Sequence, residues 1–367
     1  MQGWAARAGL PEFPWDQLAP YGEKARTHPD GIVDLSIGTP VDPTPEVVQA
    51  ALRAASDAPG YPLTIGTPEL RAALVAWCNT TLGASLSAGN VVPSIGSKEL
   101  VSLLPVLLGL TGKKVLIPHL AYPTYDVGAR LAGCTPVPTA DPTAEDPADV
   151  GLVWLNSPGN PHGEVWSSSR LRSVVTWARE HAILVASDEC YLELGWETAP
   201  VSVLHPSVSA GSTDGLLALH SLSKRSNLAG YRSGFLAGDA AAVALVIEAR
   251  KHIGLLCPAP VQAATIAALG DTAHVVEQKQ RYRARRSVLR EAVVAAGFRV
   301  DHSEAGLYLW VTRDEGCWQT VSWLADRGIL AAPGAFYGAA GAQHVRLALT
   351  ATDERIAAAA SRLASPV

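Results

Sequence analysis

Short apolar segments rich in β-branched residues alternate with longer segments of mixed polarity through the middle of the chain. This alternation is typical of an α/β fold, in which a sheet is covered by helices. Thr67-Pro68-Glu69 combines a helix cap, a proline in the first turn and an early carboxylate, which together mark a helix start. The pattern predicts strands at residues 90–93, 114–117, 150–155, 182–187, 216–221 and 233–237, and helices at 68–82, 99–108 and 170–181.

The pattern changes after about residue 258, where a long helix is predicted at 271–296. Mixed pieces at 306–311 and 344–349 follow it, and a final helix begins after Thr352. A length of 367 residues suits two domains. We therefore predict a large domain at 44–259, with a mainly parallel central sheet and helices on both faces. A smaller α+β domain is predicted from both chain ends, 1–43 and 260–367.

The long predicted helix has an apolar stripe and a basic run. Val275, Tyr282, Leu289 and Val293 fall on one side of it, and this side is expected to pack against the rest of the protein. The basic side chains are predicted to form its solvated face rather than an anion site. These basic residues are Lys279, Arg281, Arg283, Arg285 and Arg286.

Composition limits the classes of partner. The 29 basic and 34 acidic residues give a net charge of −5, which argues against nucleic acid as the main partner. The N-terminus lacks the basic start and apolar run of a signal peptide, and the longest apolar stretch is broken by Pro105, so no membrane partner is expected. Five scattered cysteines without a CxxC pair predict neither a disulfide framework nor a metal site. A cytoplasmic location is expected.

Polar and aromatic residues follow five of the predicted strands. In open α/β sheets, ligands bind beyond the carboxyl ends of the strands, so these residues are the candidates for a site. The five segments are Ser94-Ile95-Gly96-Ser97-Lys98, Pro118-His119-Leu120-Ala121-Tyr122, Asn156-Ser157-Pro158-Gly159-Asn160-Pro161, Asp188-Glu189-Cys190-Tyr191 and Ser221-Leu222-Ser223-Lys224.

Lys224 follows an apolar strand and lies among small hydroxyl residues. A partly desolvated lysine near other cations has a lowered pKa and can form a Schiff base with a carbonyl compound. Ser221, Ser223 and Arg232 would then supply hydrogen-bond donors for a phosphate. These residues indicate a cofactor that carries both an aldehyde and a phosphate.

Asp188 follows an apolar strand that we expect to be buried, so its carboxylate needs a partner. A protonated pyridine nitrogen would be one, and the pair would make the ring an electron sink. Gly96-Ser97-Lys98 opens a predicted helix, whose free N–H groups suit a phosphate. Each of these residues taken alone could also be an ordinary turn or helix start.

Three motifs together resemble a known family. SLSKRSNLAGYRSG at 221–234, NSPGNPHG at 156–163 and DECY at 188–191 are similar to motifs of the class I/II aminotransferases, which are enzymes of fold type I that depend on pyridoxal 5'-phosphate (PLP). The order and separation of the motifs match, and the resemblance runs from about Asp34 to the C-terminal helix. It implies PLP as cofactor and a ping-pong transfer of an amino group between an amino acid and a 2-oxo acid.

The resemblance also implies the cofactor contacts. Lys224 would be the Schiff-base lysine and the general acid/base, and Asp188 would pair with the pyridine nitrogen. Asn160 and Tyr191 would hydrogen-bond the 3-oxygen of the ring, and Tyr122 would stack on the ring. The phosphate would be held by Gly96, Ser97, Lys98, Ser221, Ser223 and Arg232.

Three further residues have roles implied by the family. Arg346 would bind the substrate α-carboxylate with its guanidinium fork, Gly38 would contact the same carboxylate through its backbone, and Asn160 would also contact the substrate. Tyr61 would reach the phosphate of the neighbouring subunit, which implies a homodimer with shared active sites. His162 departs from the family motif, where threonine is more frequent, and we expect this to affect local capping more than chemistry.

The segments LPEFPWDQL, HPDGIVDLSIGTPVDPTP and GYPLTIGTPELR make the chain closely similar to actinobacterial N-succinyldiaminopimelate aminotransferases. This implies N-succinyl-L,L-diaminopimelate and 2-oxoglutarate/glutamate as the substrate pair, in lysine and diaminopimelate biosynthesis. Such a substrate has carboxylates at its far end. Lys98 and Arg225 are candidates to bind them, and Trp15 is a candidate wall at the mouth of the site.

Three alternatives share parts of this pattern. Another class I aminotransferase, acting on aspartate or aromatic amino acids, would have the same motifs. A PLP-dependent carbon–sulfur β-lyase would share Lys224, Asp188 and Tyr191, but it would release pyruvate and ammonia. The aminotransferase-like sensor module of some transcription regulators carries an added DNA-binding domain and linker, for which a chain of 367 residues leaves no room.

Overall fold

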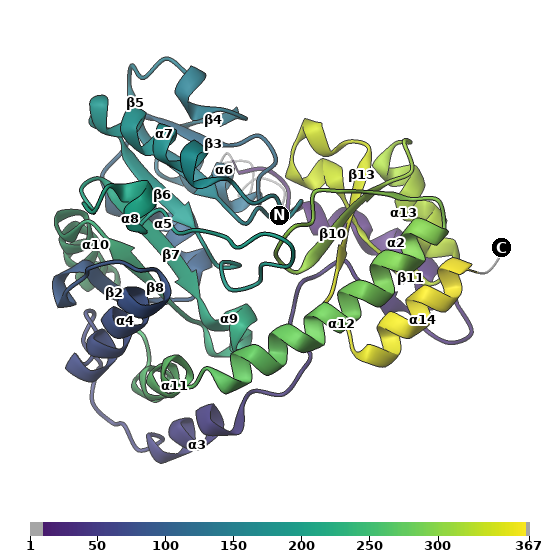
Figure 1. Ribbon diagram of the computed structural model, residues 1–367, viewed down its shortest axis with the longest axis horizontal. Helices are drawn as coiled ribbons and strands as arrows, with labels where there is room; N and C mark the ends of the chain where they lie inside the picture. The colour runs from purple at the N-terminus through teal and green to yellow at the C-terminus, as the bar shows by residue number, and fades with distance from the viewer. Residues whose placement is uncertain (1–9, 365–367) are drawn as a thin grey trace, which may run out of the picture.

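The computed structural model describes residues 10–364, and in it two larger sheets with their helices lie side by side, with a third, two-stranded sheet beside the smaller of them (Figure 1). The larger sheet has seven strands, of which only β8 runs antiparallel to its neighbours. The mainly parallel central sheet is therefore confirmed. In spatial order its strands are β2 (Val91–Ile95), β8 (Ser233–Gly238), β7 (Leu216–Ser221), β6 (Leu184–Asp188), β5 (Val150–Asn156), β3 (Lys114–Pro118) and β4 (Thr135–Thr139).

Strand β4 is the member of this sheet that the sequence did not predict. Its sequence, TPVPT, has prolines at 136 and 138, and proline cannot donate a hydrogen bond to a neighbouring strand. The strand lies at the edge of the sheet, next to β3 alone, where missing donors are tolerated.

Helices cover both faces of the larger sheet, as predicted (Figure 1). Each face of the sheet packs in a separate hydrophobic core. In β5, Val153 and Leu155 pack on one face, while Leu152 and Trp154 pack on the other. The helices of the first core are α3 (Glu46–Ala54), α4 (Pro68–Thr81), α7 (Ser168–Glu180) and α11 (Ala259–Gly270); those of the second are α5 (Ser97–Leu107), α6 (Thr124–Leu131) and α10 (Ala240–Ile253).

The second sheet is antiparallel and forms a separate core with helices from both ends of the chain. Leu18 and Val33 from the N-terminal part pack in this core with Leu347 and Leu363 from the C-terminal part. The sheet order is β12 (Ala332–Pro333), β13 (His344–Ala348), β10 (Tyr308–Thr312) and β9 (Arg299–Asp301), and β1 (Val33–Asp34) pairs with β11 (Ile329–Leu330). Its helices are α2 (Ala19–Arg26), α12 (Ala273–Ala295), α13 (Cys317–Asp326) and α14 (Asp353–Ala364).

The domain boundaries stay a prediction. Ala264 and Ala268 of α11 pack in the core of the larger sheet, although the boundary expected at residue 259 assigned this helix to the smaller domain. Residues 1–9 and 365–367 of the predicted smaller domain lie outside the described part of the chain. The remaining short elements are α8 (Pro206–Ser209), α9 (Leu222–Arg225) and the 3-10 helices η2 (Pro14–Leu18), η3 (Ala88–Asn90), η4 (Pro142–Ala144), η5 (Ala229–Tyr231), η6 (Gly334–Tyr337) and η7 (Ala339–Gly341).

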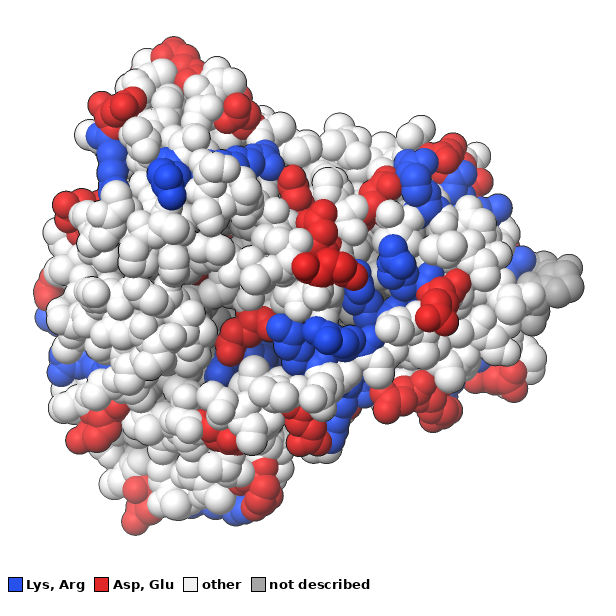
Figure 2. All heavy atoms as spheres, in the orientation of Figure 1, with Lys and Arg blue, Asp and Glu red and all other residues white. Residues whose placement is uncertain are grey.

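The apolar stripe of α12 is buried as predicted, but the prediction of a fully solvated basic face was wrong for Arg285. This side chain is 4% exposed, and its Nη2 and Nη1 donate to Asp42 Oδ1 and Oδ2 at 2.6 and 2.7 Å. Position 285 follows Tyr282 by three residues and precedes Leu289 by four, so the guanidinium lies on the packed stripe and needs a carboxylate there. In Figure 2, Lys and Arg side chains gather over α12 next to acidic ones.

Within residues 10–364, no helix is long and apolar enough to cross a membrane. The five cysteines are free, and four of them are buried. No group of three or more His, Cys, Asp or Glu side chains in this described part could hold a metal ion.

Candidate active site

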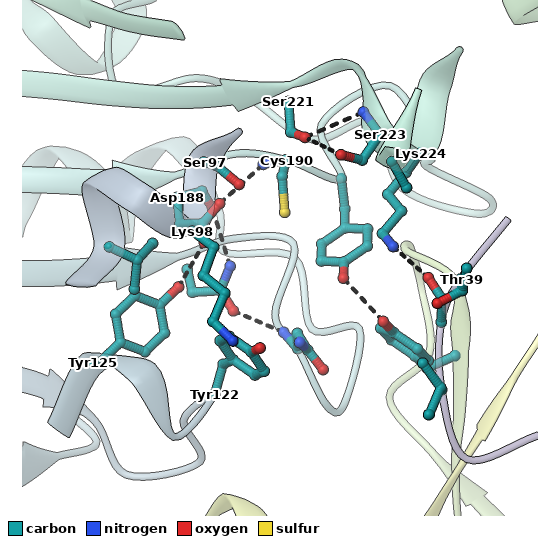
Figure 3. A pocket seen from close by; sticks show the side chains of 18 of the residues that line it. Thr39, Ser97, Lys98, Tyr122, Tyr125, Asp188, Cys190, Ser221, Ser223 and Lys224 are labelled. Carbon is teal, nitrogen blue, oxygen red and sulfur yellow. Dashed lines mark hydrogen bonds between the residues drawn. The ribbon is translucent and has the colours of Figure 1, made fainter. Parts of the chain in front are cut away.

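A cavity of about 600 Å³ lies where the carboxyl ends of β5, β6 and β7 face the second sheet. Its lining comes from several segments that are distant in the sequence (Figure 3). A cavity at this edge of a parallel sheet is the position expected from the fold. Of the residues predicted for the site, those that line it are Gly38, Ser97, Lys98, Tyr122, Asn160, Asp188, Tyr191, Ser221, Ser223, Lys224, Arg232 and Arg346.

Asp188 ends β6, and its side chain is 7% exposed at the bottom of the cavity. Tyr125 Oη donates to its Oδ2 at 2.9 Å, and the Cys190 amide donates to its Oδ1 at 3.2 Å. Burial raises the pKa of the Asp188 carboxyl, although both hydrogen bonds act against the shift. Among residues 10–364 no cation lies within ion-pair distance of it, so this carboxylate suits a cationic ligand atom in the cavity.

Lys224 reaches the cavity from α9, which follows β7 directly. Ser221 caps this short helix, because its Oγ accepts a hydrogen bond from the Ser223 amide at 3.2 Å. Lys224 Nζ donates to the carbonyl of Gly38, which lies in the segment between β1 and α3. In Figure 3, Lys224 and Lys98 lie on opposite sides of the cavity. The amine therefore reaches the cavity between the two sheets.

A group of hydroxyl and N–H donors lies beside Lys224. Ser221 Oγ donates to Ser223 Oγ at 2.9 Å, and Arg232 Nη1 donates to the carbonyl of Ala229 at 3.0 Å. Gly96 does not line the cavity but makes room for the Arg232 guanidinium: a Cβ at this glycine would lie 2.3 Å from Arg232 Nη2. These donors, with the first turn of α5, suit an oxyanion such as phosphate.

Arg346 enters the cavity from β13 and is 3% exposed. Its Nη1 donates to Asn160 Oδ1 at 2.8 Å and its Nη2 to the Ser36 carbonyl at 2.7 Å, while its Nε is buried without a partner. The guanidinium carbon lies 3.9 Å from the centre of the Tyr308 ring. A planar cation that is held in place and has an unused donor suits a carboxylate ligand.

Tyr191 and Tyr308 were not predicted as a pair, but their hydroxyl groups lie 3.0 Å apart in the cavity wall. Burial and the neighbouring Tyr308 raise the pKa of Tyr191 well above its usual value, so it keeps its proton. Gly38 is required opposite this pair, because a Cβ there would lie 2.2 Å from Tyr308 Oη. Tyr308 lies in a segment, 306–311, that the sequence marked only as a mixed piece, and no local signal pointed to its place in the site.

Tyr125 was also missed, and Asn156, although it begins one of the five candidate segments, was given no role. Tyr125 follows the predicted Tyr122 by three residues and lies in the first turn of α6, whereas Tyr122 precedes that helix. Asn156 Nδ2 donates to the Asp188 carbonyl at 3.0 Å, and its Oδ1 accepts from the Asn160 amide at 2.8 Å. Asn156 is the last residue of β5, as Asp188 is the last residue of β6.

The prediction that Arg225 binds the far end of a substrate was wrong. Its guanidinium is buried against the Glu193 carboxylate and lines a different, small cavity with Trp77. Its neighbour Lys224 faces the site, and consecutive residues of a helix point in directions about 100° apart. Trp15 does line the main cavity, as expected.

Two other expectations concern residues outside the cavity. Tyr61 is 97% exposed and lies away from the cavity of its own chain. His162 is buried, and its ring packs against Gly159, where a Cβ would lie 2.5 Å from His162 Cε1. Burial lowers the pKa of the imidazole, and its Nε2 lies 3.3 Å from Glu164 Oε2. His162 therefore packs within its own loop.

Comparison with known proteins identifies the class that this fold and cavity define. Residues 30–363 match the family described as aminotransferase class I and II, and the chain belongs to this family. Its fold is that of the PLP-dependent transferases of fold type I, and its activity is that of an aminotransferase.

Individual relatives cover nearly the whole chain. It is 57% identical to the 4-dedimethylamino-4-oxo-anhydrotetracycline transaminase OxyQ of Streptomyces rimosus, over 96% of this chain and 99% of that protein. It is 58% identical to a probable aminotransferase of Mycobacterium tuberculosis, over 97% of this chain and 86% of that protein. The solved structure of a probable N-succinyldiaminopimelate aminotransferase from Thermus thermophilus is similar with a TM-score of 0.85 and 28% identity, covering 96% of this chain and 99% of that chain.

The family uses PLP, and the residues of this cavity fit that cofactor. Asp188 is a buried carboxyl group that has no cation beside it within residues 10–364, as a site for a protonated ring nitrogen requires. Lys224 presents a primary amine, and Ser221, Ser223 and Arg232 present donors for a phosphate at the same end of the cavity. Tyr122 adds an aromatic face.

Proposed function

We propose that this aminotransferase exchanges an amino group between N-succinyl-L,L-diaminopimelate and the 2-oxoglutarate/glutamate pair, and so acts in diaminopimelate and lysine biosynthesis. The observation that carries the proposal is the presence of two separate cations for carboxylates in one cavity, Arg346 and Lys98. A long substrate with a carboxylate at each end would contact both. The similarity to the Thermus protein supports the same substrate.

Within this proposal, Arg346 binds the α-carboxylate of the amino acid, and the hydrogen bonds to Asn160 and Ser36 hold its guanidinium in place. When bound, PLP supplies an aldehyde that reacts with amines and a ring that takes up electrons. Lys224 Nζ would take the proton from the substrate α-carbon and pass it to the former aldehyde carbon of the cofactor in the same half of the cycle, and it would move a proton the opposite way in the other half. Asp188 would hold the ring nitrogen as a carboxylate, and Tyr191 and Asn160 would donate to the 3-oxygen of the ring.

Lys98 is the residue proposed for the far carboxylate. Its Nζ lies 5.6 Å from the centre of the Tyr122 ring, and no carboxylate within residues 10–364 pairs with it. A Lys98→Met variant keeps the apolar length of the side chain and removes the charge. It should raise KM for N-succinyl-L,L-diaminopimelate about tenfold, since a charge-assisted hydrogen bond is worth about 1.5–3 kcal/mol.

The control for Lys98→Met is alanine as amino donor, which has no far carboxylate and should keep its KM. An equal rise of KM for both donors would assign Lys98 to the cofactor alone. An unchanged KM for both would remove Lys98 from the site. Arg53→Met provides a matched surface variant, because Arg53 is 60% exposed on α3.

A second candidate substrate is a polycyclic ketone. Phe13 and Trp15 form a stacked aromatic pair at the cavity, with ring centres 5.5 Å apart and planes 30° apart. Such a surface would also accept a flat fused-ring compound, and the identity of 57% to OxyQ favours this class. The substrate with the higher kcat/KM in parallel assays, succinylated amino acid or fused-ring ketone, decides between the two.

The proposed active form is a homodimer in which Tyr61 from one copy donates to the phosphate bound by the other. Tyr61 is 97% exposed and Leu63 is 65% exposed, which suits a surface that a second copy covers. The expected cytoplasmic location stays a prediction.

A further inference from the structure

A buried ion pair lies directly behind the turn that joins β2 to α5. Glu99 is 6% exposed in the first turn of α5, and Arg250 of α10 is fully buried. Arg250 Nε donates to Glu99 Oε1 at 2.9 Å, and its Nη2 donates to Glu99 Oε2 at 3.3 Å. Neither side chain lines the active-site cavity.

This pair holds the turn from inside. Glu99 Oε2 accepts a hydrogen bond from the Ile95 amide at 2.6 Å, and Arg250 Nη1 donates to the Pro93 carbonyl at 2.7 Å. The two side chains therefore fix the last residues of β2 and the first turn of α5 relative to each other. Ser97 and Lys98 are the first two residues of that turn, and their N–H groups point out of the helix end.

The backbone of Ile95 also connects to Arg232. The Ile95 carbonyl accepts from Arg232 Nη2 at 3.4 Å, while its amide is held by Glu99. Arg232 has a left-handed backbone with a φ of 56° and passes close to Gly96. A shift of Ile95, whose two flanking peptide groups make these contacts, would therefore move both the helix start and the guanidinium.

We propose that Glu99 and Arg250 are positioning residues for the phosphate of PLP: they hold the 95–98 turn so that its N–H groups and Arg232 converge on the phosphate. A buried ion pair is weak evidence for stability, because desolvating both charges offsets most of the attraction. Its value here is the geometry that it fixes. Arg250 has a second effect, since it neutralises a carboxylate that would otherwise repel the phosphate.

This inference rests on the assignment of PLP and is independent of the amino-acid substrate. The test compares binding of PLP and of pyridoxal, which lacks the phosphate, to the apoenzymes of wild type, Glu99→Gln and Arg250→Met. Dissociation constants come from absorbance titration. A positioning role predicts that PLP binds about tenfold more weakly to either variant while pyridoxal binding is unchanged, because only charge-assisted contacts to the phosphate are lost. Arg250→Met should have the larger effect.

Asp42→Asn is the matched control, because it breaks a buried ion pair, with Arg285, that lies outside the turn. Its ratio of PLP to pyridoxal affinity should equal that of wild type. If one of the single variants does not fold, the neutral pair Glu99→Gln/Arg250→Met replaces it, with the same expected loss for PLP. Equal weakening of PLP and pyridoxal, or a lower Tm with both affinities unchanged, would overturn the proposal.

Discussion

Asp188 and Glu189 are consecutive carboxyl groups at the end of β6 with different surroundings. Asp188 lines the active-site cavity, whereas Glu189 lies on the other side of the sheet beside His220 and Trp77. Glu189 Oε1 accepts from the Val203 amide at 2.8 Å, but its Oε2 is buried without a hydrogen bond and lies 3.6 Å from His220 Nε2. Burial raises the pKa of Glu189 to about 7.

The raised pKa of Glu189 predicts a pH-dependent stability effect. A carboxyl group that is protonated in the fold and ionised in the unfolded chain favours unfolding as the pH rises from 4.5 to about 7. Glu189→Gln removes this effect and should be more stable than wild type above pH 7, by on the order of 2 kcal/mol. Chemical denaturation of both holoenzymes at several pH values measures the difference.

The stability difference between Glu189→Gln and wild type should grow from pH 5 to pH 8. Burial lowers the pKa of His220 to about 3, so its titration affects both proteins alike and cancels in the difference. Glu23→Gln, at an exposed position on α2, should show no such trend. If Glu189 were instead ionised and paired with a protonated His220, the variant would be less stable than wild type, most of all near pH 5.

At the scale of single residues, the sequence located most of the polar side chains that line the cavity. Lys224, Asp188 and Asn160 follow apolar strands, and the fold brings strand ends together. It did not locate Tyr308, because the approach of the second sheet to the first is set by packing between distant segments. It misplaced Arg225, because nearness in sequence does not fix the direction of a side chain. The roles of these residues remain predictions.

At the scale of elements, the pattern of apolar residues was sufficient where a strand or helix has one clear buried side. The helix predicted at 68–82 is α4 (Pro68–Thr81), and its cap is as expected, since Thr67 Oγ1 accepts from the Leu70 amide at 3.1 Å. Strand β4 was not predicted, because its two prolines are unusual in a strand. The burial of Arg285 was not predicted, because it depends on an ion pair with Asp42, which is far away in the sequence.

Arg285 connects three elements. It pairs with Asp42, in the segment before α3, and its Nε donates to Asp353 Oδ1 at the start of α14 at 2.5 Å. The Asp42 side chain also accepts from Gln278 Nε2 at 2.8 Å. Although burial alone would raise it, the hydrogen bonds from Arg285 and Gln278 hold the pKa of Asp42 below its usual value.

Asp42→Asn should therefore lower the free energy of unfolding at pH 7 by about 2 kcal/mol, since one partner of a buried pair is lost. The carboxylate contributes its stability above its unfolded pKa, so the difference from wild type should disappear as the pH falls through the lowered pKa of Asp42. Denaturation at pH 7 and pH 3 measures this. A difference that is the same at both pH values would show that Asp42 does not act through its charge.

At the scale of the whole molecule, the cavity is formed by both sheets together with the N-terminal segment. Arg346 comes from the small sheet, Lys224 from α9 directly after β7 of the large sheet, and Gly38 from the chain that connects the two. The sequence predicted that both chain ends form one unit, and the core that contains Leu35 and Leu347 supports this. The relative packing of the two units could not be predicted from the local pattern of apolar and polar residues.

The proposed sharing of sites between two copies can be tested with mixed dimers. Tyr61→Ala and Lys224→Ala are each impaired as homodimers. In a hybrid, one site combines an intact Lys224 with an intact Tyr61 from the other copy, so mixing should restore about a quarter of wild-type activity. If Tyr61 serves its own chain, the hybrid has no intact site and mixing restores nothing.

The central claim, that the site moves an amino group rather than releasing it, is tested most directly by a single turnover. Holoenzyme is mixed with excess glutamate and no 2-oxo acid, and 2-oxoglutarate and ammonia are quantified. The account predicts one 2-oxoglutarate per active site, no ammonia, and no further reaction until a 2-oxo acid is added, with none of this in Lys224→Ala. Continued release of ammonia, or an unchanged yield from Lys224→Ala, would contradict it.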